Sequence, residues 1–110
     1  MKVKLARLAW ARSGDKGDGS NVGVIAKSPE IYEFLRGALT KERVKAHFHK
    51  ICLGAVRRFE APNLWALNFI LHDSLGGGGS ASLKTDAQGK THGLGLLQLE
   101  LDLPDTVRLP

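Results

Sequence analysis

A polar segment punctuated by glycine separates two apolar runs near the start of the chain, and it constrains the possible folds more than any other feature. The segment covers residues 11–21 and reads ARSGDKGDGSN. The run before it, residues 2–11, alternates imperfectly between apolar and polar side chains, and the run after it, residues 21–26, is rich in β-branched residues. Both patterns are typical of strands. We therefore expect a loop that joins two neighbouring strands or the two halves of one interrupted strand.

Two helices are predicted after the second strand. The tripeptide Ser28-Pro29-Glu30 combines an N-cap hydroxyl, a proline in the first turn and an acid near the positive end of the helix dipole. Apolar residues at helical spacing continue from there to about Leu39. Thr40 is the expected N-cap of a second helix, which should reach about Ile51 before Gly54 ends it.

The second half of the chain contains three predicted strands and one ambiguous stretch. Residues 55–61 and 64–71 are predicted strands, and Pro62-Asn63 between them is a turn signal, so we expect a hairpin whose second strand is the more buried one. For residues 82–96 a hairpin turn and a glycine-weakened helix both remain open, with the helix favoured. Residues 97–103 alternate leucine with polar side chains, which predicts a half-exposed strand.

This order of elements predicts an α+β fold: a ferredoxin-like sandwich with a mostly antiparallel sheet, helices on one face and an extra N-terminal strand. The 110 residues match one ordinary domain. We expect that single domain to cover residues 1–103 and residues 104–110 to form a flexible tail.

Composition and charge limit the kinds of binding partner and the cellular compartment that we expect for this protein. The net charge of +5 favours anionic partners, although the basic residues are scattered along the chain. No apolar run approaches the roughly 20 residues that a membrane span needs, and no signal-peptide pattern is present at the start. A lone cysteine, Cys52, fits a reducing compartment. We expect a soluble cytoplasmic protein with no membrane partner.

Spacing excludes several familiar sites. The sequence Gly89-Lys90-Thr91 has Lys84 where a P-loop needs glycine. Oxygen ligands do not recur at EF-hand positions in the registers that start at Asp15 or Asp18. Ser13 lies in Arg-Ser-Gly-Asp and not in the Gly-x-Ser-x-Gly elbow of a nucleophilic serine. The sequence therefore predicts no metal ion and no cofactor.

Two polar residues in the 64–72 region stand out. Asn68 is a carboxamide among apolar neighbours and needs hydrogen-bonding partners if buried. His72 precedes the glycine run Gly76-Gly77-Gly78-Gly79 and could act as a general acid or base, although a strand-end histidine hydrogen-bonded to the backbone is the favoured interpretation. The glycine run itself fits either an anion-binding nest or a mobile connector.

Several strings of the sequence together resemble one family, the AtuA-like ferredoxin-fold domain. The strings are ARSGDKGD at residues 11–18, NVGVIA at 21–26, RVKAHF at 43–48, ALNF at 66–69 and LGGGG at 75–79. This domain occurs at the C-terminus of acyclic terpene utilisation AtuA-type proteins and also as a small stand-alone protein. The resemblance spans roughly residues 3 to 101 and implies the ferredoxin-like fold.

The resemblance also implies a link to the catabolism of acyclic terpenoids and related branched acids through acyl-CoA intermediates. No reaction is attached to the small domain, so candidate site residues are assigned from residue chemistry at the motif positions. The catalytic candidates are Asp15 and His72. The binding candidates are Arg12, Ser13, Lys16, Asp18, Asn21, Asn68, Gly76, Gly77, Gly78 and Gly79.

Three functional hypotheses follow. The leading one is an accessory subunit that docks on a larger AtuA-type protein, or on copies of itself, and contributes residues 11–21 to an interfacial acyl-CoA or carboxylate site. The second is a stand-alone lyase or hydratase on a CoA-linked acid. The third and weakest is an RNA-binding module, and the lack of any RNP-like aromatic string argues against it.

Overall fold

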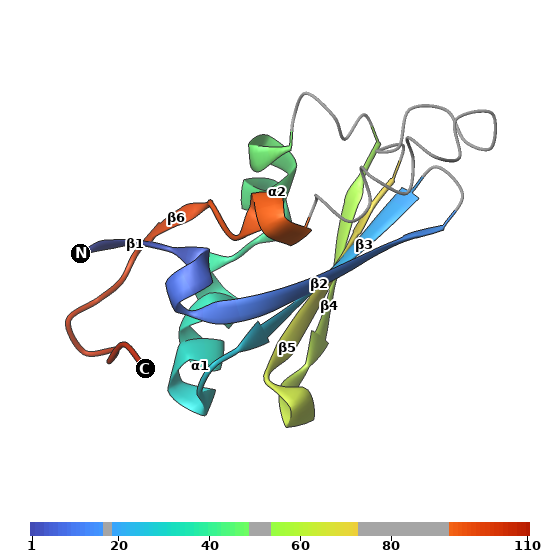
Figure 1. Cartoon of the computed structure of the whole chain (residues 1–110). Helices are drawn as coiled ribbons and strands as arrows, with labels where there is room; N and C mark the ends of the chain where they lie inside the picture. The colour runs from blue at the N-terminus through green and yellow to red at the C-terminus, as the bar shows by residue number, and fades with distance from the viewer. Residues whose placement is uncertain (17–18, 49–53, 73–92) are drawn as a thin grey trace.

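The computed structural model describes residues 1–16, 19–48, 54–72 and 93–110 of the chain. The main sheet has four strands, and the two α-helices and a separate two-stranded ribbon lie on one side of it (Figure 1). The elements are, in chain order, β1 (Lys2–Lys4), a 3₁₀ turn (Leu5–Arg7), β2 (Ala9–Lys16), β3 (Gly19–Ala26), α1 (Pro29–Ala38), α2 (Lys41–His47), β4 (Val56–Ala61), a second 3₁₀ turn (Pro62–Leu64), β5 (Ala66–Leu71) and β6 (Glu100–Asp102).

The main sheet has the strand order β2-β3-β5-β4, and every neighbouring pair is antiparallel. β1 and β6 form the separate antiparallel ribbon, with Val3 opposite Leu101. α1 packs against β3 and α2 against β4. The predicted α+β class with helices on one face is therefore confirmed, and the extra N-terminal strand lies outside the main sheet.

Most of the expected polar loop belongs to strands. Residues 11–16 lie in β2 and residues 19–21 in β3, paired from Ala11 opposite Val24 to Lys16 opposite Gly19. Only residues 17–18 lie outside the described part of this hairpin. The prediction of an extended loop was wrong because glycine and polar residues suggest a loop locally, whereas backbone pairing with β3 does not depend on apolar side chains.

The first predicted strand is split in two. Leu5 and Leu8 are both fully buried, which strict alternation in a strand cannot achieve because residues three apart point to opposite faces. The 3₁₀ turn places both on one side, and Leu8 N–H donates to the Leu5 carbonyl at 2.9 Å.

Both predicted helix caps are present. Ser28 Oγ accepts a hydrogen bond from Ile31 N–H at 3.1 Å, and Thr40 Oγ1 accepts one from Arg43 N–H at 3.2 Å. α1 ends at Ala38, close to the predicted end, whereas α2 ends at His47 and is shorter than expected.

The C-terminal end of α1 is held by a side chain from the sheet. The Arg58 guanidinium on β4 donates to the carbonyls of Arg36 at 2.8 Å and Leu39 at 3.0 Å. A cation at this position donates to carbonyls that have no partner within the helix. Its positive charge also lies at the negative end of the helix dipole, which is a stabilising arrangement. α1 is therefore fixed to β4 by a polar contact as well as by packing.

The core lies between the helices and one face of the sheet. β4 and β5 form the predicted hairpin, but the burial of β5 alternates: Leu67, Phe69 and Leu71 are buried, while Asn68 and Ile70 are half-buried. The expectation of a strand with nearly continuous burial was wrong because no described helix or strand covers the second face of the sheet.

The C-terminal segment is only partly a strand. Residues 93–96 form a helical turn, Leu97 and Gln98 continue as a turn, and β6 is limited to Glu100–Asp102. The alternation predicted for Leu99, Leu101 and Leu103 is confirmed, since all three are buried. The rest of the ambiguous 82–96 stretch lies outside the described residues. Val107 and Leu109 pack against the core, and the domain boundary at residue 103 stays a prediction.

No helix in the described ranges is long and apolar enough to cross a membrane.

Tyr32 on α1 carries a polar atom that the core leaves unsatisfied. The residue is 3% exposed, and its hydroxyl has no hydrogen-bond partner among the described residues. Burial, with a smaller effect from the Glu60 carboxylate, raises the pKa of Tyr32 above its ordinary value. An unpartnered buried hydroxyl costs about 1 to 3 kcal/mol relative to a partnered one.

We predict that Tyr32→Phe leaves the free energy of unfolding unchanged or raises it by about 1 kcal/mol at pH 7. Because the folded-state pKa is raised, the unfolded chain ionises first, so the wild type loses stability as the pH rises above about 10 and the variant lacks this loss. Urea unfolding of both proteins across this range measures the difference. Tyr32 is the only tyrosine, so tyrosinate absorbance reads its pKa directly. A clear destabilisation by Tyr32→Phe at pH 7 would contradict the assignment.

Candidate functional site

The sheet has one face that no described helix or strand covers, and we call it the open face. It is the face turned away from α1 and α2 (Figure 1). Its residues alternate along each strand with the core residues and are exposed or half-buried. They are Trp10, Arg12 and Gly14 on β2, Asn21, Gly23 and Ile25 on β3, Ala66, Asn68 and Ile70 on β5, and Arg57, Phe59 and Ala61 on β4. None of these residues is acidic.

Three of the predicted binding residues lie on this face: Arg12, Asn21 and Asn68. Arg12, Gly23 and Asn68 lie side by side in one row across β2, β3 and β5, and Asn21 lies in the next row beside Gly14. Asn68 Oδ1 is 3.8 Å from the position that a Cβ on Gly23 would take. The Arg12 guanidinium makes no hydrogen bond or ion pair within the described chain, so its charge is available to an anion.

His72 is held at the end of β5. Its backbone N–H donates to the Ala55 carbonyl at 3.0 Å, and its own carbonyl accepts from Gly54 N–H at 3.1 Å, so sheet pairing continues one residue past the strand. Its side chain is exposed. The backbones of Asp15 and Lys16 pair with Ser20 and Gly19 at the far end of β2.

Other candidates lie outside the described residues or away from this face. Asp18 and Gly76, Gly77, Gly78 and Gly79 belong to the ranges that the structure does not describe. Ser13 packs against the helical turn of residues 93–96, since a Cβ on Gly93 would lie 3.0 Å from Ser13 Oγ. The sheet therefore separates Ser13 from Arg12 and Asn68. The binding and catalytic roles of all these residues stay predictions.

Aromatic residues on the open face were not anticipated as site residues. Trp10 is 58% exposed and Phe59 is 45% exposed. Lys27 Nζ lies 5.5 Å from the Trp10 ring centroid, and Arg57 Cζ lies 5.6 Å from that of Phe59. The alternation along residues 56–61 could have shown that Arg57 and Phe59 lie on the same face of their strand. Only the pairing of β4 with β5 shows that this face is turned away from the helices.

Trp65 adds an exposed aromatic at the end of the β4–β5 hairpin. Its φ is 53°, in the left-handed region that bulky side chains rarely adopt, and it is 41% exposed. Ala26 N–H donates to the Trp65 carbonyl at 2.8 Å, which anchors this backbone to β3. Burial in the core therefore does not explain why the bulky Trp65 occupies a strained backbone conformation. The neighbouring Leu64 is exposed as well.

Two glycines in the open face are not required by the fold. A Cβ on Gly14 would meet nothing within 4 Å, and one on Gly23 would make only ordinary contacts at 3.8 Å. Neither glycine has a positive φ. Glycine inside a strand costs about 0.5 to 1 kcal/mol relative to alanine, and it often marks a place where another molecule approaches the backbone closely. The two glycines leave bare backbone beside Arg12 and Asn68.

We predict that Gly14→Ala and Gly23→Ala leave the free energy of unfolding unchanged or raise it by up to about 1 kcal/mol. Gly93→Ala is the matched control and should destabilise, because its Cβ would lie 3.0 Å from Ser13 Oγ and 3.2 Å from Ser13 Cβ. Chemical denaturation of the three variants tests the order. Equal destabilisation by all three would mean that the fold itself needs the open-face glycines.

His47 makes contacts between α2 and the 93–96 turn. His47 Nε2 lies 2.9 Å from the Gly95 carbonyl oxygen, and its ring packs edge-on against Phe48, so it ties α2 to the 93–96 turn. No group of three or more histidine, cysteine, aspartate or glutamate side chains within the described ranges could hold a metal ion.

Comparison with known families decides the classification. The profile described as the AtuA ferredoxin-like domain matches residues 3–102. The chain belongs to the AtuA ferredoxin-like domain family. No curated protein and no solved structure matches it. Membership in this family confirms the resemblance found in the sequence and the ferredoxin-like fold, and it places the Arg12–Asn68 row inside the matched region of the AtuA ferredoxin-like domain.

Proposed function

We propose that this AtuA ferredoxin-like domain is a cytoplasmic accessory subunit or binding domain of an AtuA-type system for the catabolism of acyclic terpenoid or branched acyl-CoA compounds. In this proposal it docks on a larger AtuA-type protein. It contributes the β2–β3 hairpin and the open face to an acyl-CoA or carboxylate site at the interface.

The observation that carries the proposal is the row formed by Arg12, Gly23 and Asn68. A guanidinium with no partner within the described chain supplies charge for a phosphate or carboxylate, and the half-buried Asn68 carboxamide supplies both a donor and an acceptor. Bare backbone at Gly23 lets a ligand or a partner come close between them. The open face therefore has the chemistry of a recognition surface.

Its composition also supports docking to a different protein. Tryptophan, phenylalanine and arginine are enriched at protein interfaces, and Trp10, Phe59, Arg12 and Arg57 gather here without an acidic side chain. A second copy of the chain placed face to face would set arginines against arginines. Charge complementarity therefore favours a partner with acidic groups over self-association through this face.

The same arrangement counts against the RNA-binding alternative. Modules that read RNA on a sheet stack bases on aromatic side chains beside one another. Trp10 and Phe59 lie on β2 and β4, the two outer strands, which are about 14 Å apart across three strand spacings. The central strands β3 and β5 carry Asn21, Gly23, Ile25, Ala66, Asn68 and Ile70 on this face, with no aromatic among them.

A calorimetric titration tests the proposal. The probe is 3-methylbutanoyl-CoA, titrated into the chain alone, into a larger AtuA-type protein alone, and into their mixture. We predict binding that is strongest in the mixture and that Arg12→Glu weakens by about tenfold or more, because it replaces an anion-binding charge by a repelling one.

Arg108→Glu is the charge-matched control. Arg108 is exposed near the C-terminus and lies outside the open face, so this variant should bind like the wild type. If neither the chain nor the mixture binds the probe, or if Arg12→Glu binds it as well as the wild type, the proposal is wrong. Turnover of the probe by the isolated chain that disappears in Asp15→Asn would instead support the lyase or hydratase hypothesis.

A further inference from the structure

Strand β4 is one of the two edges of the sheet, and no described residue pairs with the backbone groups on its outer side. His72 N–H donates to the Ala55 carbonyl, and β4 continues antiparallel to β5 from there. Because hydrogen-bonded and non-hydrogen-bonded pairs alternate in such a ladder, Arg57 and Phe59 bond toward β5. The N–H and C=O groups of Val56, Arg58 and Glu60 therefore point away from the sheet, and no described residue pairs with them.

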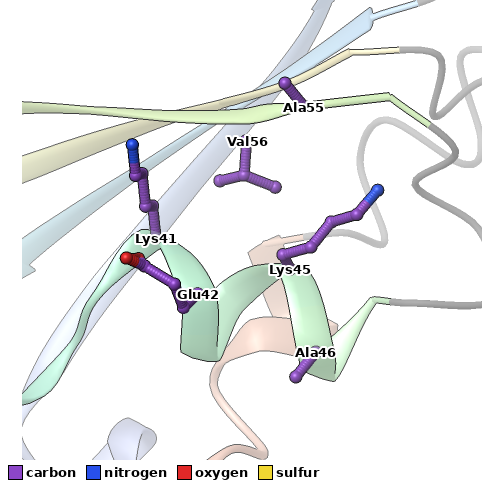
Figure 2. A pocket seen from close by; sticks show the side chains of 6 residues that line it. All are labelled: Lys41, Glu42, Lys45, Ala46, Ala55 and Val56. Atoms are coloured by element: carbon purple, nitrogen blue, oxygen red, sulfur yellow. The ribbon is translucent and has the colours of Figure 1, made fainter.

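A groove runs along this edge beside α2. One cavity of about 430 Å³ is lined by Lys41, Glu42, Lys45, Ala46, Ala55 and Val56. A second cavity of about 260 Å³ is lined by Thr40, Lys41, Glu42 and Arg58. The two cavities share Lys41 and Glu42, so they lie next to each other between Val56 and Arg58, and we refer to them together as the groove. Figure 2 shows Lys41 and Lys45 extending from α2 toward β4, with Val56 pointing into the space between them.

The groove combines a small apolar floor with a positive rim. Ala46, Ala55 and Val56 supply the apolar surface. Two lysines outnumber the one glutamate of the lining, and Lys45 Nζ already donates to the Gly54 carbonyl. The Lys41 ammonium makes no hydrogen bond or ion pair within the described chain, so it is the charge available to an occupant.

The Arg58 guanidinium already makes hydrogen bonds within the chain. It donates to the carbonyls at the end of α1 and lies 3.1 Å from Glu60 Oε2. Its positive charge therefore adds to the electrostatic potential of the groove, while its hydrogen bonds to α1 stay in place. The charges that face the groove thus favour an acidic occupant at the Lys41 end.

We propose that the groove between β4 and α2 binds an extended segment of a partner protein as a fifth strand of the sheet. Backbone bonds to Val56, Arg58 and Glu60 hold the segment, as in other cases of strand addition to a sheet edge. Side chains of a strand that point to one face are two residues apart. One small apolar side chain rests on Val56 and Ala46, and an acidic side chain two residues away pairs with Lys41.

A second copy of the chain is a poorer occupant of this groove. β4 carries two arginines and one glutamate, so pairing the β4 edges of two copies would join two strands that are both net positive, and like charges across a strand pair destabilise a sheet. At the other edge of the sheet, the 93–96 turn packs against β2 at Ser13. The chemistry of the groove therefore points to an acidic peptide at β4.

Selection from a displayed hexapeptide library against the wild-type chain tests this inference. We expect selected peptides to carry an acidic residue two positions from a small apolar one. Their affinity, measured by fluorescence anisotropy, should fall about tenfold in Lys41→Glu. Ala46→Tyr, which fills the groove from the exposed side of α2, should abolish binding. Lys2→Glu makes the same charge change on β1 and should bind normally.

Amide hydrogen exchange distinguishes strand addition from any other binding mode. On binding of a selected peptide, the amides of Val56, Arg58 and Glu60 should gain protection, whereas those of Arg57 and Phe59, which already bond to β5, should change little. The inference is overturned if the library yields no binder. It is also overturned if the selected peptides bind Lys41→Glu as tightly as the wild type or protect β2 in place of the outward-facing amides of β4.

Discussion

The pairing of β3 with β2 on one side and β5 on the other is the constraint on which the rest of the structure depends. This register buries Val22 and Val24 with Leu67 and Phe69, and the same register puts Arg12, Gly23 and Asn68 into one row on the opposite face. A shift of one residue would exchange the two faces of a strand. The core and the candidate site are therefore two consequences of a single pairing.

The two surfaces proposed for binding differ in their physical basis. The open face relies on side chains: cationic and aromatic groups at its edges, and glycines that leave the backbone bare between Arg12 and Asn68. The groove beside β4 relies on backbone groups at a strand edge, with Lys41 and Val56 selecting the occupant. Because the sheet lies between them, the open face and the groove can be occupied at the same time.

The recognition role proposed for this member of the AtuA ferredoxin-like domain family rests on the open face of its sheet. The register puts the Arg12 guanidinium and the Asn68 carboxamide in one row, and these are the groups that the proposal assigns to anion recognition. The polar groups of α1 differ in how they are satisfied: the Tyr32 hydroxyl is buried with no partner among the described residues, while the Arg58 guanidinium donates to carbonyls at the end of the helix.

The sequence by itself determined the features whose causes are local. The caps at Ser28 and Thr40, the turn at Pro62 and the alternation of Leu99, Leu101 and Leu103 depend on neighbours a few residues away, and all were predictable. Tertiary structure alone decided that a polar, glycine-rich segment is a strand, that Leu5 and Leu8 require a 3₁₀ turn, and that β1 pairs with β6. It also decided that Arg12 and Asn68 meet while Ser13 faces the other way. These outcomes depend on pairing between distant segments, where one residue of register reverses which side chains are buried.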